Sequence, residues 1–256
     1  MTGQPLRMVD LFSGIGGFSL AGQWAGFDTI QFVEIDAYCQ RVLAKNFPGV
    51  KIDSDIKSFC GNGLRGTVDL LTGGFPCQDV AGVNRHACGL DGKRSGLWRE
   101  MFRVIAECQP RYVVIENVSD LRKRGLDIVL KDLSSIGYDA EWHSLRASDC
   151  GAPHERERLF VIAYPDNQPE LQTDTLFTAL GGIGDAWDYA GWGDWRHLPE
   201  PDWAVSKPGG ARMDAWVSGW VERHRQRTGA LGNAIVPQVV YPILLAIAES
   251  LRKETA

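Results

Sequence analysis

The residues Asp10-Leu11-Phe12-Ser13-Gly14-Ile15-Gly16-Gly17 join the end of an apolar run to a cluster of glycines. The run Met8–Leu11 predicts a buried strand, and the amphipathic stretch Phe18–Ala25 predicts the helix that follows it. Glycines between a strand and a helix permit a tight turn and let a ligand approach the backbone closely. The stretch lacks the full Gly-x-Gly-x-x-Gly fingerprint, so alone it is compatible with either a ligand-binding turn or a purely structural one.

Short apolar runs alternate with amphipathic stretches up to about residue 165. This alternation predicts βαβ units, which right-handed crossovers would assemble into a doubly wound α/β fold with a mainly parallel sheet. Ligands of such folds bind at the carboxyl ends of the strands. The expected strands are Met8–Leu11, Thr29–Glu34, Val68–Thr72, Tyr112–Glu116 and Leu159–Tyr164, and the expected helices are Phe18–Ala25, Ala37–Phe47, Leu97–Glu107, Leu126–Ile136 and Ile235–Leu251.

The composition narrows the class of protein. The chain has 256 residues, of which 44% are hydrophobic and 23% charged, so a folded domain with a sizeable core is expected. No apolar run approaches the length of a membrane span, and no secretory signal pattern is visible, so we expect a cytoplasmic protein that does not bind membranes. The six cysteines have neither C-x-x-C nor zinc-site spacing, which predicts free thiols and no metal. A net charge of −5 argues against a general polycation but leaves room for a local basic groove.

An acidic motif follows the glycine-rich turn. Val33-Glu34-Ile35-Asp36 ends the second expected strand, about 20 residues further along the chain, where an acid can accept hydrogen bonds from ribose hydroxyls. The turn and the acid together indicate a nucleoside-containing cofactor. A glycine-rich turn beside an exposed acid, with no ligand, is the alternative.

Two further strand ends carry reactive groups. Gly73-Gly74-Phe75-Pro76-Cys77-Gln78 places a cysteine where sheets bind ligands, and a thiolate there would be a strong nucleophile; an inert buried thiol is the alternative. Val113-Val114-Ile115-Glu116-Asn117-Val118 places a carboxylate at the end of a buried strand, where burial would raise its pKa towards neutrality.

Two motifs lie nearer the carboxyl terminus. In His154-Glu155-Arg156-Glu157-Arg158 the two arginines would share one face of an extended chain, either in a site or on an alternating-charge surface strand. Gly232-Asn233-Ala234-Ile235-Val236-Pro237-Gln238 opens the last expected helix, with Asn233 as a cap and Pro237 near the first turn.

Taken in order, these motifs resemble those of the cytosine-5 DNA methyltransferase family, especially compact phage- or prophage-borne members. The resemblance covers nearly the whole chain outside about Pro165–Gly229, and its most specific elements are Pro76-Cys77-Gln78 and Glu116-Asn117-Val118. It implies the Rossmann-like fold of S-adenosylmethionine-dependent methyltransferases and a site-specific DNA (cytosine-5) methyltransferase. The alternatives are an RNA cytosine-5 methyltransferase and a catalytically silent protein that binds DNA or cofactor.

The resemblance also implies roles for individual residues. Cys77 would attack carbon 6 of a flipped cytosine, Glu116 would contact its N3 and amino edge, and Arg158, with Arg156 nearby, would contact the O2 side and phosphate. Residues expected to bind S-adenosylmethionine, and its product S-adenosylhomocysteine, are Phe12, Gly14, Gly17, Glu34, Ile35, Asp55, Ile56, Gly74, Pro76, Leu97, Asn233 and Ile235. Residues expected to contact DNA are Gln78, Arg85, Arg212, Arg223, Arg225 and Arg227.

The resemblance divides the chain into a catalytic and cofactor-binding domain, residues 1–164 with 228–256, and a small target-recognition domain, residues 165–227. The second region is rich in Trp, which would form a small hydrophobic cluster or support DNA-reading loops. Residues 205–230 hold five cations against two acids, as a phosphate-binding surface or a solvated helix face would. We expect a monomer acting on double-stranded DNA, with any cognate restriction enzyme acting separately. His154 stands where many relatives carry glutamine, and it can still form a hydrogen bond.

Overall fold

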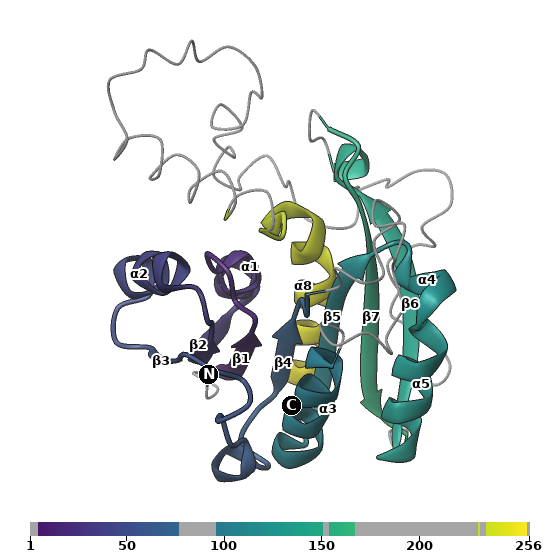
Figure 1. Ribbon diagram of the computed structural model, residues 1–256, viewed down its shortest axis with the longest axis horizontal. Helices are drawn as coiled ribbons and strands as arrows, with labels where there is room; N and C mark the ends of the chain where they lie inside the picture. Colours follow the sequence, from purple (N-terminus) through teal and green to yellow (C-terminus); the bar gives the residue numbers. More distant parts are fainter. Residues whose placement is uncertain (1–4, 77–95, 151–153, 167–229, 231–233, 255–256) are drawn as a thin grey trace.

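The computed structural model describes residues 5–76, 96–150, 154–166, 230 and 234–254 (Figure 1). Within them the strands form one seven-stranded sheet of order β3-β2-β1-β4-β5-β7-β6. Neighbours from β3 to β5 are parallel, whereas β7 runs antiparallel to both β5 and β6. The strands are β1 (Leu6–Leu11), β2 (Phe27–Val33), β3 (Lys51–Asp53), β4 (Leu70–Gly73), β5 (Tyr112–Val118), β6 (Tyr138–Arg146) and β7 (Glu157–Pro165).

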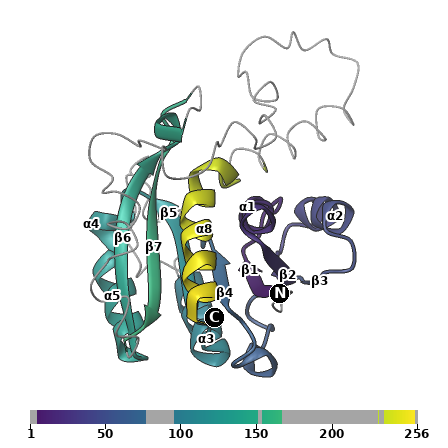
Figure 2. The same cartoon turned by 180° about the vertical axis from the view of Figure 1, so that it is seen from behind.

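Helices cover both faces of this sheet, as the two opposite views show (Figures 1 and 2). One face packs against α3, α4 and α5, and the other against α1 and α8. The helices are α1 (Gly17–Ala25), α2 (Ala37–Asn46), α3 (Leu97–Cys108), α4 (Leu121–Arg124), α5 (Leu126–Ser135) and α8 (Pro237–Glu254), with 3-10 turns η1 (Asn62–Leu64) and η3 (Ala147–Cys150).

Alternate residues of the central strands belong to opposite layers of the core. Val113 and Ile115 of β5 pack in the cluster with α3 and α5, whereas Tyr112 and Val114 pack in the cluster with α1 and α8. All four are fully buried. Burial on both faces explains why β5 is a continuous apolar run that only the polar pair Glu116-Asn117 interrupts.

Local signals in the sequence fix the helix ends on either side of β2. Gly26 has a φ of 89° and donates its N–H to the carbonyls of Gln23 and Gly22, which ends α1 in the left-handed conformation that glycine adopts easily. The Asp36 side chain accepts hydrogen bonds from the backbone N–H groups of Tyr38 and Cys39 and so caps the start of α2. The glycine-rich turn and the acidic motif are therefore each followed at once by a helix.

The expected α/β fold with a mainly parallel sheet is confirmed, and the five expected strands and five expected helices agree with the structure to within a few residues. The sequence did not predict β3, β6 or the antiparallel direction of β7. Strand β6 mixes charged, exposed and buried residues, so it lacks the apolar run of a central strand. Among the described residues no helix is long and apolar enough to cross a membrane. Residues 167–227 lie outside the described ranges, so the two-domain division stays a prediction.

Candidate active site

Predicted site residues follow the ends of five neighbouring parallel strands. Asp55 comes after β3, Glu34 after β2, Gly14 after β1 and Gly74 after β4, and Glu116 lies near the end of β5. Because these strands are parallel neighbours, their carboxyl ends meet at one edge of the sheet, called here the carboxyl-end edge. The fold therefore brings together residues that are distributed over the first half of the chain.

The Glu34 carboxylate ties the acidic motif to the glycine-rich turn. Its Oε2 accepts a 2.6 Å hydrogen bond from the Gly14 N–H, and its Oε1 accepts one of 2.7 Å from the Asp36 N–H. The side chain amide of Gln40 holds the Glu34 carbonyl oxygen at 2.6 Å. Glu34 is buried and fixed, yet each carboxylate oxygen keeps a second lone pair that a ligand hydroxyl can use.

An apolar side chain and a second carboxylate lie next to Glu34 on this edge. Ile35 is 76% exposed, which is unusual for a large apolar residue and leaves its surface available to a planar ligand. Asp55 follows β3 and closes a turn, in which its Oδ1 accepts from the Lys57 N–H at 2.9 Å. Ile56, by contrast, is buried in the core among the residues that pack against α3.

Gly17 lies against Ile235, so α8 begins beside the glycine-rich turn. A Cβ at residue 17 would overlap the Ile235 side chain and lie 2.7 Å from its carbonyl oxygen. Only glycine permits this approach, which explains its place in the turn. Phe12 has a positive φ of 53° at the end of β1. The structure thus joins the two ends of the chain at the predicted cofactor site.

The residues before Cys77 are held in place by β5 and α3. The Asn117 amide donates from Nδ2 to the Phe75 carbonyl oxygen at 3.0 Å, and its Oδ1 accepts from the Val118 N–H at 2.8 Å. The Phe75 ring packs against Trp98 with ring centroids 5.5 Å apart. Pro76, which follows Phe75, is exposed. Asn117 is buried, so its bond fixes the backbone of Phe75, just before Pro76.

Gly74 allows the same backbone to pass close to Glu116. A Cβ at residue 74 would lie 3.0 Å from Glu116 Oε2. Any larger side chain there would push the carboxylate aside or be displaced itself. Leu97, another predicted pocket residue, is half-buried at the start of α3.

Glu116 forms a partly buried ion pair with Arg158. The Arg158 Nε lies 2.8 Å from Glu116 Oε1, and the Glu116 side chain is only 13% exposed. Despite this short distance, Oε1 receives no hydrogen bond from the described residues. The site therefore presents a buried acceptor with an unused lone pair, an arrangement that a ligand donor would satisfy.

Burial and charge act on Glu116 in opposite directions. Burial raises the pKa of the Glu116 carboxyl, whereas Arg158 and Arg156 lower it; the effect of burial is the larger one. Burial, together with repulsion from Arg158, lowers the pKa of Arg156. The backbone N–H of Arg156 approaches His154 Nδ1 at 3.4 Å, so His154 does accept a hydrogen bond within this motif.

The sequence indicated no role for Asp10, and none for Asn117 beyond its place in the motif. Asp10 is fully buried and accepts hydrogen bonds from Ser19 Oγ at 2.9 Å and Thr72 Oγ1 at 3.0 Å. These bonds link β1, α1 and β4 beneath the glycine-rich turn. Burial raises the pKa of Asp10 to about 7, although both hydroxyls oppose the shift. The available signal was the same for both residues, a polar side chain within an apolar run.

Several predicted residues lie outside the described ranges, and their roles stay predictions. They are Cys77, Gln78, Arg85, Arg212, Arg223, Arg225, Arg227 and Asn233. Of the six cysteines, the four that are described, Cys39, Cys60, Cys108 and Cys150, are free thiols. Across the described part of the chain, no three His, Cys, Asp or Glu side chains are grouped so as to hold a metal ion.

A doubly wound sheet with buried acids and close glycine turns along its carboxyl-end edge is the arrangement of a nucleotide-binding α/β fold. The model of the family described as C-5 cytosine-specific DNA methylase matches residues 6–184. The chain belongs to this family, as its motifs predicted.

Individual relatives agree with this assignment. The chain is 35% identical over 183 residues to the Type II methyltransferase M2.BsuMI of Bacillus subtilis (strain 168), an alignment that covers 68% of this chain and 45% of the relative. It is 35% identical over 167 residues to the Type II methyltransferase M.CviJI of Paramecium bursaria Chlorella virus IL3A. That alignment covers 64% of this chain and 45% of the relative. The chain thus spans about half the length of these curated relatives.

Solved structures share the fold. A DNA modification methyltransferase encoded within an E. coli prophage superposes with a TM-score of 0.53 at 29% identity, over 71% of this chain and 56% of that one. The Dnmt2 methyltransferase of S. pombe superposes with a TM-score of 0.54 at 22% identity, over 64% of this chain and 51% of that one, a likeness of fold alone.

Proposed function

We propose that this chain is a site-specific DNA (cytosine-5) methyltransferase that uses S-adenosylmethionine. One observation carries the proposal: the buried Glu116 carboxylate, with an unused acceptor on Oε1, lies between Arg158 and the backbone that leads to Cys77. A carboxyl group in this position matches the N3 and amino edge of a cytosine. That edge is paired in a duplex, so the base must be flipped out to reach it.

Glu116 would hold and polarise the base. Its free acceptor on Oε1 would take the cytosine amino N–H, which removes the cost of an unsatisfied buried oxygen. Because burial raises its pKa, the carboxyl can also share a proton with N3 and draw electrons from carbon 6. The Arg158 and Arg156 guanidiniums would face the O2 side of the ring, since arginines donate several N–H bonds in a fixed plane.

Cys77 would supply the nucleophile. Its thiolate forms a bond to carbon 6 while the ring electron pair moves towards carbon 5, which becomes nucleophilic. After methylation a base removes the proton from carbon 5, the ring double bond re-forms, and the sulfur–carbon bond breaks to return the thiolate. The hydrogen bond from Asn117 to Phe75 supports this role, because it holds the chain two residues before Cys77.

The glycine-rich turn and its neighbours fit S-adenosylmethionine. Glu34 offers lone pairs to the ribose hydroxyls, Ile35 offers an exposed apolar face to the adenine, and Asp55 lies after the adjoining strand as an acceptor. The contact between Gly17 and Ile235 closes the wall of this region. When bound, S-adenosylmethionine supplies the methyl group and leaves as S-adenosylhomocysteine.

Residues 165–227 would read the DNA sequence, with Arg212, Arg223, Arg225 and Arg227 near the phosphates and Gln78 and Arg85 close to the target. The substrate would be double-stranded DNA and the protein a cytoplasmic monomer. The relatives are named Type II methyltransferases, which supports a place beside a separately acting restriction enzyme. The alternatives are an RNA methyltransferase of the same fold and a silent binding protein.

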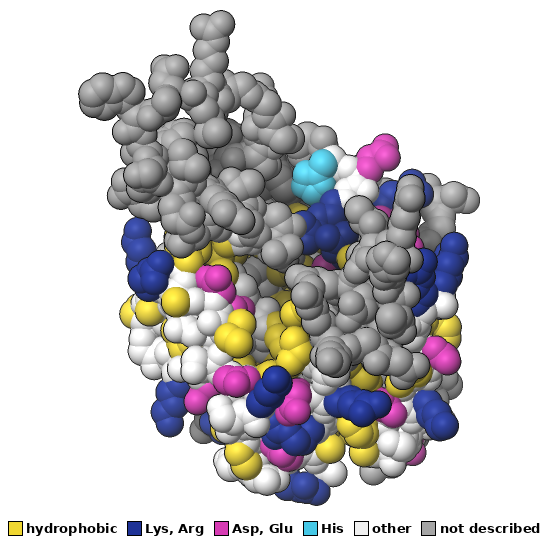
Figure 3. Space-filling view, viewed as in Figure 1, with side chains coloured by type: hydrophobic (Ala, Val, Ile, Leu, Met, Phe, Trp, Pro, Cys, Tyr) yellow, Lys and Arg dark blue, Asp and Glu magenta, His cyan; other side chains and the backbone are white. Residues whose placement is uncertain are grey.

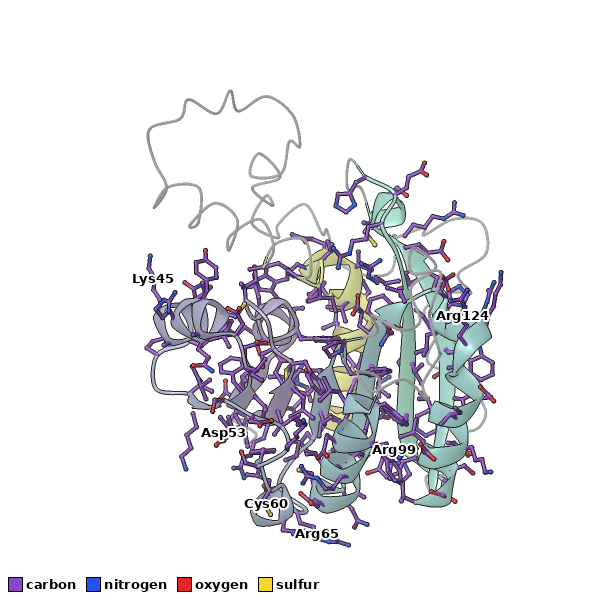
Figure 4. All side chains as sticks on the ribbon, viewed as in Figure 1. Lys45, Asp53, Cys60, Arg65, Arg99 and Arg124 are labelled. Carbon is purple, nitrogen blue, oxygen red and sulfur yellow. The ribbon has the colours of Figure 1, made fainter. Side chains whose placement is uncertain are left out.

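Trapping on fluorinated DNA tests the proposal. Fluorine at carbon 5 cannot leave as a cation, so duplex DNA with 5-fluorocytosine at the target should form an adduct stable to denaturing electrophoresis, and with S-adenosylmethionine the adduct should carry the methyl group. Cys77→Ser should abolish the adduct, because a hydroxyl is far less ionised than a thiol. Cys60→Ser is the matched control, since Cys60 is exposed at the opposite edge of the sheet (Figure 4).

Each alternative gives a different result. An RNA methyltransferase would form the adduct on fluorinated RNA and not on DNA, and a silent binding protein would form none. Methylation of cytosine without any adduct would overturn the role of Cys77. Bisulfite sequencing of DNA from cells that express the protein would then identify the methylated sites.

A further inference from the structure

A short cationic helix follows β5 and has no part in the site described above. Helix α4 carries Arg122, Lys123 and Arg124 in succession, and all three side chains are exposed. Within the described ranges, Arg122 and Lys123 take part in no ion pair. The chain as a whole carries a net charge of −5, so this run of cations is a local exception.

The backbone of α4 is fixed to the core. Leu121 is fully buried in the cluster that packs against α3 and α5. The Arg122 N–H donates to the Ser119 carbonyl at 3.1 Å, and the Lys123 N–H donates to the Asp120 carbonyl at 3.0 Å. The cations therefore project from an anchored turn. An anchored turn presents charge to a ligand at a smaller entropic cost than a free loop would.

Helix α4 begins shortly after the strand that carries Glu116. Five residues lie between Glu116 and Arg122, so the stretch spans at most about 20 Å. Strand β5 ends between them at Val118. Figure 3 shows Lys and Arg side chains gathered over α4, and Figure 4 places Arg124 on the outer side of the sheet, far from Lys45 on α2. The phosphates on either side of a flipped nucleotide would lie within this range.

The two arginines nearest Glu116 do not serve this purpose. Arg158 is paired with the Glu116 carboxylate, and Arg156 is half-buried. Neutralising the backbone outside the pocket requires exposed cations within reach of it. Arg122 and Lys123 are exposed cations, and the chain length from Glu116 keeps them within about 20 Å of it.

We propose that Arg122 and Lys123 form a phosphate-binding surface for the backbone of duplex DNA next to the flipped cytosine. This inference rests on the proposed function. The contact is electrostatic and indifferent to base sequence, so it positions the duplex while other residues select the site. Binding releases counterions from the phosphates, which makes the contribution of the surface dependent on salt.

The test is the salt dependence of binding by the full chain. The probe is an unmodified duplex that contains the methylated site, without S-adenosylmethionine, so that binding stays reversible. The variant is Arg122→Ala with Lys123→Ala. Each lost phosphate contact lowers the slope of log affinity against log salt by about 0.9, so the double variant should lower it by about 1.8. Arg122→Lys alone should leave the slope unchanged, because it keeps the charge.

The control is Arg65→Ala with Lys253→Ala. Both residues are exposed cations, Arg65 before β4 and Lys253 at the end of α8, so the control removes the same charge from the opposite edge of the sheet (Figures 1 and 4). Urea unfolding should show equal stability for the two double variants, because neither changes a buried side chain. The loss of DNA affinity in the Arg122 and Lys123 variant should be equal on duplexes with and without the methylated site.

Equal salt slopes for the two double variants and the wild type would contradict the proposal that Arg122 and Lys123 bind phosphates. That result differs from failure of the proposed function, in which the wild-type chain itself neither binds the duplex nor forms the adduct. A reduced slope on structured RNA but not on DNA would likewise refute a surface for duplex DNA.

Discussion

The Nε atom of Arg158 lies 2.8 Å from Oε1 of Glu116, and the antiparallel register of β5 and β7 places it there. Arg158 pairs with Val118 and Phe160 with Glu116, so the arginine on β7 stands two residues along from the acid, on the same face of the sheet. The parallel β7 implied by a simple doubly wound sheet would not pair Arg158 with the end of β5. The reversed strand therefore supplies the cation that accompanies the buried carboxyl.

This ion pair predicts how Arg158→Gln changes the pH dependence of the rate of adduct formation. Under the proposed mechanism the protonated Glu116 carboxyl assists the thiol addition, so the rate of adduct formation falls as pH rises through its pKa. Arg158 lowers that pKa, so its removal should raise the pKa of Glu116. The descending limb of the pH–rate profile should then move to higher pH. The measurement is the rate of adduct formation on 5-fluorocytosine DNA across a pH series.

The control for this experiment is Arg146→Gln. Arg146 lies on the neighbouring strand β6, is 59% exposed in its side chain, and faces Glu157 at 3.8 Å instead of Glu116. Its removal should leave the limb in place. A limb that moves to lower pH in the Arg158→Gln protein would contradict the proton-sharing role of Glu116.

Asn117→Ala should slow adduct formation without weakening cofactor binding. The change leaves the Phe75 carbonyl without its donor, which costs about 1–3 kcal/mol of unfolding free energy and loosens the backbone before Cys77. Tyr138→Phe is the matched control, since its hydroxyl donates to the buried Pro110 carbonyl far from the site. If the two variants lose stability alike and react at the same rate, Asn117 is merely structural.

The residues at the carboxyl-end edge were predictable from the sequence because each is identified by the apolar run directly before it. Glu34, Gly74 and Glu116 each follow an apolar run, and parallel strands bring such positions to one edge whatever the order of the strands. The direction of β7 was not predictable, since an apolar run buries equally well in either direction.

The contacts made by Asn117 and Asp10 could not be predicted from the sequence either. Each depends on side chains or carbonyls of elements distant in the chain, such as Phe75 for Asn117 and Thr72 for Asp10. A polar residue in an apolar run indicates that a partner is needed but does not identify it.

Glu34→Gln should weaken S-adenosylmethionine binding by about 1–3 kcal/mol, the scale of a hydrogen bond to a charged group. Glu34 also holds the Gly14 N–H, so a loss alone does not distinguish a ribose contact from a disturbed turn. An S-adenosylhomocysteine analogue without ribose hydroxyls separates the two, because it should bind the wild type and the variant with similar affinity. Calorimetry with both ligands measures this, and an equal loss for both would assign Glu34 to the turn alone.

The buried carboxyl of Asp10 should make the free energy of unfolding depend on pH. Its pKa is about 7 in the folded protein and about 3.9 when unfolded, so between these values the folded state keeps a proton that the unfolded state releases. Stability from this group is therefore fully present below about pH 4 and is lost as pH rises to about 7, at up to about 1.4 kcal/mol per pH unit.

Asp10→Asn cannot ionise, and its amide can still bond to the hydroxyls of Ser19 and Thr72. The free energy of unfolding of the variant, minus that of the wild type, should therefore rise in favour of the variant from pH 4 to 7 and then level off. Urea unfolding across this range measures the difference, with Asp28→Asn, an exposed acid on β2, as the control for net charge. A difference that stays constant with pH would mean that Asp10 remains ionised in the core, held by the two hydroxyls that link β1 to α1 and β4.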